Sequence, residues 1–404
     1  MSYFLSPRKV LFGKGMLKRL GAELEGRGNK AVLITDKNMV KLSGELVEAV
    51  KGAGYEVKIW DGAEQEPSIE GAGEALKALQ DFGPQLIIGF GGGSVLDTAK
   101  AAWVLWENPG IAAAEIATAV NVRARLSWQK KARFMTVPTT SGTGSDVTWA
   151  IVLTDKAAHR KIGFANAEIV PDITLLVPEF TTGMPKALTA STGLDVLGHA
   201  LDGYTARQQT DFSDGLCLQA MKLAFDWLPR ACADGNDLTA REKMQNAATI
   251  AGLGFGNSNT SLCHALAHTL GATFNIPHGR SVGIALPYSL EYISSNPPIE
   301  GAPDPVKRLA TAASFVGIKA KTDQEAIRKL IQKLRDLARE TGEPLSLKEA
   351  GITEQHMKDN LDTLAAIASK DVNMYSTPCE CKDEKLRQLF QDMWAGDSRR
   401  KKTE

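Results

Sequence analysis

Short apolar runs alternate with helical patterns through the first half of the chain. The runs are rich in β-branched or aromatic residues and are bounded by turn residues, which predicts buried strands. They lie at 31–35, 55–60, 85–90, 133–137 and 173–177. Stretches with apolar positions at helical spacing lie between them, for example at 37–52, 68–81 and 94–106. This alternation is typical of a mostly parallel sheet that helices cover on both faces, so we predict an α/β fold here.

A further pair of apolar runs, at 149–153 and 161–164, is separated by a polar turn. This pattern predicts a β-hairpin, which we expect to join the main sheet. After residue 177 no strand pattern recurs, and apolar residues follow helical spacing to the end of the chain. We therefore predict two domains: an α/β domain over 1–183 and an all-helical domain over 184–404.

Composition narrows the class of protein. The chain has 404 residues, and its 47 basic and 47 acidic side chains cancel, so no overall field favours nucleic acid or an anionic membrane. Nothing resembles a signal-peptide core or the roughly 18 apolar residues that span a bilayer, so we expect a cytoplasmic protein. The five cysteines are odd in number and scattered, which argues against a disulfide framework.

A glycine-rich turn, Gly91-Gly92-Gly93-Ser94, follows one predicted strand and opens a predicted helix. Glycines let a pyrophosphate approach the backbone, and the N–H groups of a helix N-terminus favour its negative charge. Ser94 stands where the last glycine of the dinucleotide fingerprint would be. Close packing of the strand against the helix is the alternative explanation for these glycines.

Two more polar segments follow predicted strands. Asp36 comes directly after the strand at 31–35, where a carboxylate can bind ribose hydroxyls; it could equally cap the helix predicted over 37–52. On the ribose it would repel a 2′-phosphate, so we expect NAD(H) rather than NADP(H). The turn over 138–146 is dense in small hydroxyls that suit the amide, ribose or phosphates of a nucleotide.

Histidines carry the strongest chemical signal. Asp195 and His199 are four apart in one predicted helix, so both side chains can reach one ion. His264 and His268 repeat this spacing, and His278 follows in a turn. One Asp with three His forms a mixed oxygen and nitrogen site that suits Fe(II) or Zn(II). Spacing alone does not choose between His264 and His268.

Taken together, these segments resemble the iron-dependent (group III) alcohol dehydrogenase family. The matching stretches follow the family's order and lie at 12–15, 35–37, 91–97, 138–144, 192–199, 264–268 and 277–279. The resemblance implies a Rossmann-like dinucleotide domain, then a helical metal-binding domain, as in the dehydroquinate synthase-like fold, with a cleft between them. It implies hydride exchange between NAD(H) and a small primary alcohol or aldehyde in a homodimer or higher homo-oligomer.

The resemblance also implies roles for individual residues. The metal ligands would be Asp195, His199, His264 and His278, which leaves His268 as a catalytic pocket histidine near the nicotinamide, able to relay a proton. Asp36 would bind the adenosine ribose. Backbone and hydroxyl groups around the cofactor would come from Gly92, Gly93, Ser94, Thr139, Thr140, Thr143 and Lys161. Trp149, Ala150 and Phe255 are expected in the substrate pocket.

The chain departs from the family pattern in places. It has Gln65-Glu-Pro-Ser68 where the family usually has Pro-Asn-Pro-Thr near the cofactor. Near the C-terminus the family's frequent Asn-Pro-Arg appears only as Ser376-Thr-Pro-Cys379, so the last hundred residues carry no assigned role. Arg280 follows Pro-His-Gly and would favour an anionic substrate if it pointed inward; otherwise it is a solvated arginine. Alternative functions are a polyol dehydrogenase, a dehydroquinate synthase-like lyase that uses NAD transiently, and a non-catalytic nucleotide- and metal-binding module.

Overall fold

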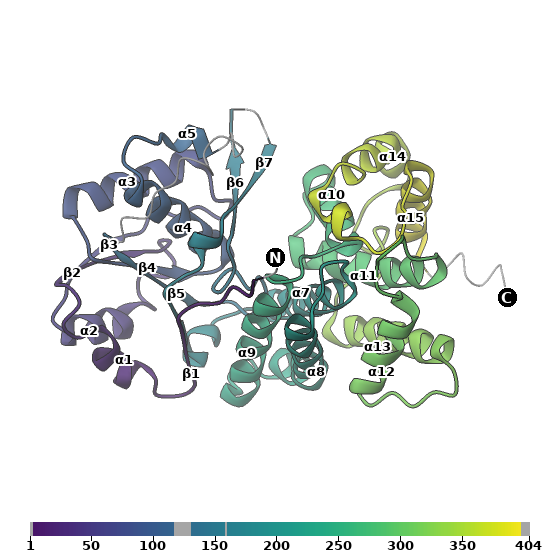
Figure 1. Ribbon diagram of the computed structural model, residues 1–404, viewed down its shortest axis with the longest axis horizontal. Helices are drawn as coiled ribbons and strands as arrows, with labels where there is room; N and C mark the ends of the chain where they lie inside the picture. The colour runs from purple at the N-terminus through teal and green to yellow at the C-terminus, as the bar shows by residue number, and fades with distance from the viewer. Residues whose placement is uncertain (1–2, 117–130, 158–159, 397–404) are drawn as a thin grey trace. The chain divides into compact units, whose positions relative to one another are not determined.

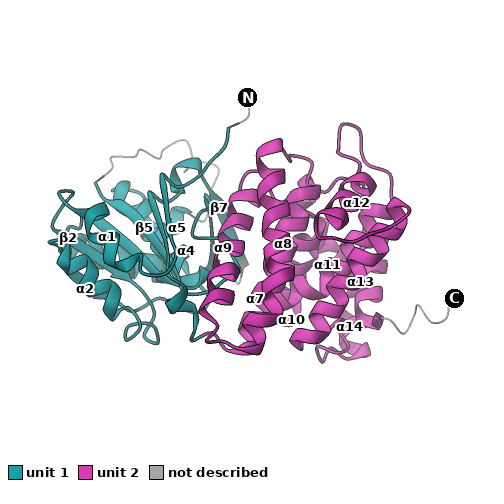
Figure 2. Ribbon diagram, turned by 90° about the horizontal axis from the view of Figure 1, so that it is seen from below, with its two compact units in different colours: residues 1–183 teal, residues 184–404 magenta. Residues whose placement is uncertain are grey.

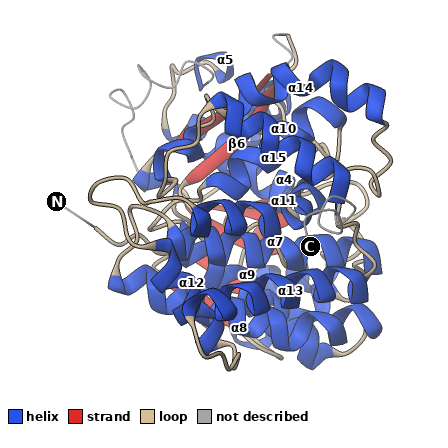
Figure 3. Ribbon diagram, turned by 90° about the vertical axis from the view of Figure 1, so that its right-hand side faces the viewer, coloured by secondary structure: helices blue, strands red, loops and turns tan. Residues whose placement is uncertain are grey.

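The computed structural model describes residues 3–116, 131–157 and 160–396. The chain divides into two compact units, Met1–Gly183 and Met184–Glu404 (Figure 2). Unit 1 contains both sheets, and unit 2 is built from helices (Figures 1 and 3). This confirms the predicted fold class, an α/β region followed by a helical one. In the described part of the chain, no helix combines the length and apolarity needed to cross a bilayer.

The main sheet of unit 1 has six parallel strands within the described residues, in the order β1-β8-β5-β4-β2-β3. Their bounds are β1 Lys9–Phe12, β2 Lys30–Ile34, β3 Glu56–Trp60, β4 Leu86–Gly91, β5 Arg133–Pro138 and β8 Ile173–Leu176. β4 is buried along its whole length. The sequence pattern indicated five of these strands; β1 begins with Lys9 and has only three apolar residues, so the pattern did not reveal it.

Helices cover both faces of this sheet. Their bounds are α1 Leu17–Leu24, α2 Gly44–Gly52, α3 Ile69–Phe82, α4 Gly93–Glu107 and α5 Ala113–Ile116. Leu33 and Ile88 pack with α1 and α2 on one face, whereas Val32 and Ile87 pack with α3 and α4 on the other. Successive strand residues point to opposite faces, so one apolar run fills both cores.

The hairpin departs from its prediction. β6 (Ala150–Asp155) and β7 (Arg160–Ala165) pair with each other as a separate antiparallel sheet. Ile151 and Leu153 are buried against apolar residues of α3 and α4. The expectation that the hairpin joins the main sheet was therefore wrong: its apolar face is covered by helices, and its alternate residue Val152 faces solvent.

Unit 2 packs its helices around one large apolar core. Their bounds are α7 Lys186–Thr205, α8 Asp211–Ala233, α9 Leu238–Phe255, α10 Leu262–Phe274, α11 His278–Ser295, α12 Pro305–Phe315, α13 Asp323–Thr341, α14 Glu354–Ala368 and α15 Asp383–Ala395. Short 3-10 turns are η1 Ala167–Ile169 and η2 Pro178–Thr181 in unit 1, and η3 Val372–Ser376 in unit 2. α7 is buried from Thr189 onward, apart from Thr192, and packs against α8, α9 and α11. A helix buried on all sides can carry polar residues only if they have partners or bind a ligand.

Candidate metal and cofactor sites

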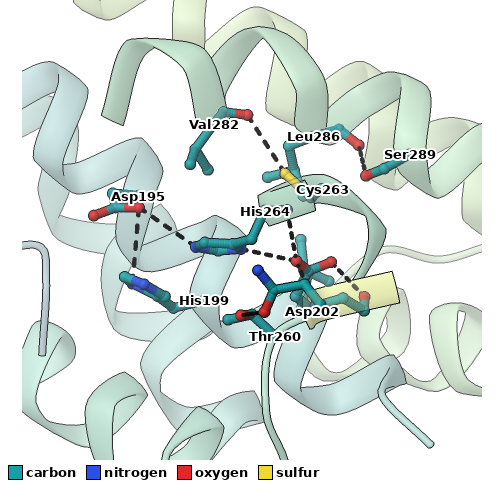
Figure 4. A network of polar contacts seen from close by, with 12 residues as sticks. Asp195, His199, Asp202, Thr260, Cys263, His264, Val282, Leu286 and Ser289 are labelled. Atoms are coloured by element: carbon teal, nitrogen blue, oxygen red, sulfur yellow. Dashed lines mark hydrogen bonds and ion pairs between the residues drawn. The ribbon is translucent and has the colours of Figure 1, made fainter. Parts of the chain in front are cut away.

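Four ionisable side chains converge inside unit 2. Asp195 and His199 come from α7, His264 from α10, and His278 is the first residue of α11. Asp195 Oδ1 lies 3.8 Å from His199 Nδ1, 3.8 Å from His264 Nε2 and 3.4 Å from His278 Nε2. Figure 4 shows Asp195, His199 and His264 turned toward one another.

Three of these atoms are buried without a hydrogen-bond partner among the described residues: Asp195 Oδ1, His199 Nδ1 and His264 Nε2. An unpaired buried polar atom costs about 1–3 kcal/mol, so three that face one point need an explanation. Ligands at about 2.1 Å from a tetrahedral ion are separated by roughly 3.4 Å, close to the distances from Asp195. The donor set therefore fits a divalent transition-metal ion.

Asp202, one turn beyond His199 on α7, fixes the orientation of His264. Its Oδ2 lies 2.8 Å from His264 Nδ1 and accepts a hydrogen bond from the His264 backbone N–H (Figure 4). Ser261 donates its N–H and Oγ–H to the same carboxylate. Because a carboxylate only accepts, Nδ1 carries a proton, and Nε2 is the nitrogen that faces Asp195 and can bind an ion once it is deprotonated. Motif spacing did not identify Asp202, although an acidic residue seven positions after Asp195, on the same face of the helix, was a signal.

Burial and neighbouring charges set the protonation of the cluster. Burial, partly opposed by Asp195, lowers the pKa of His199 to about 3, so this ring is neutral. Burial alone raises the pKa of Asp195, but the surrounding histidines hold it well below its usual value. For His264, burial lowers the pKa, yet the carboxylates of Asp195 and Asp202 outweigh it and raise the pKa to about 9. An ion entering the site has to displace that proton.

Phe255 closes one side of the cluster. Its ring stacks on His199 with centroids 4.1 Å apart, and His199 stacks in turn on His264 at 4.6 Å. His268 lies outside the four converging residues. Its ring centroid is 5.5 Å from that of His278, its side chain is 43% exposed, and its Nδ1 is 3.0 Å from Asp371 Oδ2.

In unit 1 the two predicted nucleotide-binding segments lie against each other. α4 begins at Gly93, and no side chain caps its first N–H groups. A Cβ on Gly93 would lie 2.8 Å from Thr143 Cγ2, and one on Gly92 would lie 3.4 Å from Thr140 Cγ2. The Thr139 N–H donates to Gly91 O at 3.0 Å. The glycine turn and the hydroxyl-rich turn thus form one polar edge next to the amino end of α4, where an anion is favoured.

Two residues of opposite charge on α4, Lys100 and Asp97, support this edge. Lys100 of α4 donates to Thr148 O at 2.8 Å and Ala150 O at 3.1 Å, while Asp97 accepts from Ser145 Oγ at 2.6 Å and from Val152 N at 2.9 Å. Burial, opposed by Asp97, lowers the pKa of Lys100 to about 8. The pair joins α4 to the polar turn and to β6. Sequence reasoning included Asp97 in a matching stretch without assigning this role to it.

Two other predicted cofactor residues, Asp36 and Lys161, make contacts within unit 1. Asp36 Oδ1 accepts from the Asn38 N–H at 2.8 Å. The alternative that Asp36 caps a helix over 37–52 was wrong: the chain turns after β2, and α2 begins only at Gly44, because Asp side chains favour such local turns. Lys161 on β7 is exposed, and its Nζ lies 3.8 Å from Glu66 Oε1, in the segment that departs from the family pattern.

Arg280 is neither inward-pointing nor simply solvated. Its Nε and Nη2 lie 2.8 and 3.2 Å from the two carboxylate oxygens of Glu343, whose side chain is 2% exposed. This paired geometry is the strong form of an arginine–carboxylate contact. Arg280 therefore joins the start of α11 to the segment just after α13, and its charge is neutralised within the protein.

Comparison with known proteins agrees with these features. Residues 7–178 match the family described as iron-containing alcohol dehydrogenase, and residues 189–394 match the C-terminal part of the Fe-containing alcohol dehydrogenase family. The chain is 33% identical over 399 residues to the NADPH-dependent butanol dehydrogenase of Clostridium saccharobutylicum, covering 98% of this chain and 99% of the relative. It is 33% identical to the bifunctional aldehyde-alcohol dehydrogenase of Escherichia coli (strain K12), covering 96% of this chain and 46% of that protein.

Solved structures show the same fold. The sulfoacetaldehyde reductase from Bifidobacterium kashiwanohense, solved in complex with NAD+, superposes with a TM-score of 0.84 at 27% identity, covering 98% of this chain and 100% of the other. Matches of this kind extend over both units of the chain. The chain therefore belongs to the iron-containing alcohol dehydrogenase family, as its motifs predicted.

Proposed function

We propose that this protein is a metal-dependent oxidoreductase that transfers a hydride between NAD(H) and a small primary alcohol or aldehyde. One observation carries the proposal: three buried, unpartnered atoms, Asp195 Oδ1, His199 Nδ1 and His264 Nε2, converge with His278. Family membership, and relatives named as alcohol dehydrogenases, support the same activity. In this proposal residues 1–183 bind the cofactor and residues 184–404 hold the metal.

Asp195, His199, His264 and His278 would hold the metal, Fe(II) by family and Zn(II) by the same donor chemistry. When bound, the ion supplies a Lewis acid for the substrate oxygen, and the nicotinamide supplies the hydride donor or acceptor. Asp202 keeps Nε2 of His264 available as a ligand, and Phe255 excludes water from one side of His199. Asp195 stays ionised, so it would provide a negatively charged ligand for the cation.

For the cofactor, we infer that Gly92, Gly93 and Ser94 bind the pyrophosphate at the amino end of α4, because no side chain caps that end. Thr139, Thr140, Thr143 and Lys161 would contact the rest of the dinucleotide. The butanol dehydrogenase relative is NADPH-dependent, whereas the sulfoacetaldehyde reductase was solved with NAD+. We assign NAD(H) to this chain because the Asp36 carboxylate at the end of β2 would repel a 2′-phosphate.

We propose that His268 transfers the proton that alcohol oxidation releases and aldehyde reduction takes up. Its ring lies beside His278 and is 43% exposed, so it is next to the metal cluster and still in contact with solvent. A histidine in this position accepts a proton when an alcohol is oxidised and returns it when an aldehyde is reduced. Location in the cytoplasm and assembly as a homodimer or higher homo-oligomer remain part of the proposal.

The test is a change in NADH absorbance on protein loaded separately with Fe(II) and Zn(II), with a panel of primary alcohols, aldehydes and polyols. We expect turnover with small aldehydes and a preference for NADH over NADPH. A preference for polyols would favour the polyol dehydrogenase alternative. No net change in NADH with any substrate would refute the proposal and would favour a lyase or a non-catalytic module.

A further inference from the structure

The segment that follows α14 lies against α10 and the loop before it. Asp371 and η3 bring two polar side chains to His268, more than one hundred residues away in the sequence. Asp371 Oδ2 is 3.0 Å from His268 Nδ1, and the Asp371 side chain is 13% exposed. A partly buried carboxylate that is hydrogen-bonded to Nδ1 of a histidine fixes the orientation of the ring. Carboxylates do the same for histidines that bind metals.

Asn373 holds this carboxylate in place. The backbone N–H and the Nδ2–H of Asn373 both donate to Asp371 Oδ1 at 2.8 Å, which leaves Oδ2 for His268. Asn373 Oδ1 in turn accepts from Thr260 Oγ1 at 2.6 Å. The Asp371 side chain is therefore oriented by bonds on the oxygen that does not face the histidine.

The contacts determine which nitrogen of His268 carries the proton. Nδ1 faces both Asp371 Oδ2 at 3.0 Å and Asn373 Nδ2 at 3.3 Å. A carboxylate can only accept, and its charge makes the hydrogen bond stronger than a neutral one. The second hydrogen of the Asn373 amide is a neutral donor at the longer distance, so it competes poorly with the charged acceptor. Nδ1 therefore carries the hydrogen, and Nε2 of the neutral ring keeps the lone pair.

The loop between α9 and α10 supports the carboxylates that orient two histidines, His264 and His268. Thr260 bonds the Asn373 amide that orients Asp371, and the next residue, Ser261, bonds Asp202, which orients His264. Figure 4 shows Thr260 and Asp202 at this point. One short connection thus supports both the carboxylate behind a metal-facing histidine and the carboxylate behind His268.

We propose that Asp371 is a positioning residue for proton transfer, which keeps His268 in the Nδ1–H form so that Nε2 accepts the proton of an alcohol or, once protonated, donates to an aldehyde. In oxidation the proton of the substrate O–H group would pass to Nε2, the O–H electron pair would form the C=O bond, and the hydride of the C–H bond would pass to the oxidised nicotinamide, so atoms and charges balance. This inference rests on the proposed function of His268. It also gives a role to the C-terminal region, for which no motif provided one.

The direct test is the tautomer of His268, read from ¹⁵N chemical shifts of histidine-labelled, Zn(II)-loaded protein, with His268→Gln used for assignment. We expect Nδ1–H in the wild type and a shift toward Nε2–H in Asp371→Leu. An Nε2–H ring in the wild type would overturn the proposal. This measurement does not depend on turnover, so it separates this inference from the proposed oxidoreductase activity.

The kinetic test is a double-mutant cycle. Asp371→Asn retains an acceptor without the charge, and we expect kcat to fall about 10- to 100-fold with unchanged metal content and cofactor KM. Asp371→Leu should cost more, and Asp371→Leu combined with His268→Ala should be no slower than His268→Ala alone. Additive losses would mean that Asp371 acts independently of His268 and would refute the proposal. Asp362→Asn is the control, because this exposed aspartate of α14 pairs with Arg387 only at the surface.

Discussion

Gly279 sets how closely α11 approaches α7, and its replacement tests the geometry of the metal cluster. It follows His278 directly in α11. A Cβ at this position would lie 2.4 Å from Ser191 O and 2.7 Å from Ser191 C on α7, whereas ordinary contact begins at 3.4 Å. These are backbone atoms that cannot rotate away. In Gly279→Ala the two helices must therefore separate by about 1 Å.

That displacement is large compared with the tolerance of a metal site. His278 Nε2 now lies 3.4 Å from Asp195 Oδ1, and metal–ligand distances are held to about ±0.2 Å. We expect metal affinity to fall at least 10- to 100-fold, the range seen when ligand-supporting residues are lost. The clash should also cost about 1–3 kcal/mol in the free energy of unfolding without metal, which offsets or exceeds the roughly 1 kcal/mol that alanine gains over glycine in helix propensity.

Two measurements check this: competition with a chromogenic chelator for Zn(II), and thermal unfolding of the metal-free protein. The matched control is Gly215→Ala in α8, where a Cβ meets no atom within 4 Å. The control should keep its metal affinity and gain about 0.5–1 kcal/mol in stability. Wild-type affinity and stability in Gly279→Ala would show that the two helices are not held at this distance, and the reasoning would be refuted.

Other predictions concern the ligands and the cofactor. His264→Ala should abolish both metal content and activity, whereas His268→Ala should keep the metal, measured by elemental analysis, and mainly lose kcat; retained metal in the first variant would contradict the ligand assignment. Apparent metal affinity should rise about tenfold per pH unit below pH 9, because a proton on His264, whose pKa is about 9 in the metal-free site, competes with the ion. Chelator-buffered titrations from pH 6 to 9 measure this, and a flat profile would contradict it. Asp36→Gly should raise kcat/KM for NADPH relative to NADH; an unchanged ratio would argue against a ribose contact.

Local sequence patterns were sufficient for most of the fold. Short apolar runs that alternate with amphipathic helices predicted the parallel sheet, because a strand covered on both faces is apolar along its length and a helix repeats every 3.6 residues. The β6–β7 hairpin was predicted correctly, but its predicted place in the main sheet was wrong. Its pairing within itself is local, whereas the choice between packing on α3 and α4 and extending the sheet depends on distant residues.

The candidate metal site shows the same limit. The sequence by itself placed Asp195 and His199 on one face of a helix, since residues four apart are neighbours there. Spacing did not distinguish His264 from His268, which share their helix face, and the family resemblance assigned His264 to the metal. In the structure Asp202 of α7 orients His264, and Asp371 binds His268 from beyond α14. Those contacts join elements far apart in the chain, so only the tertiary structure shows what holds His264 toward Asp195 and His268 toward the C-terminal segment.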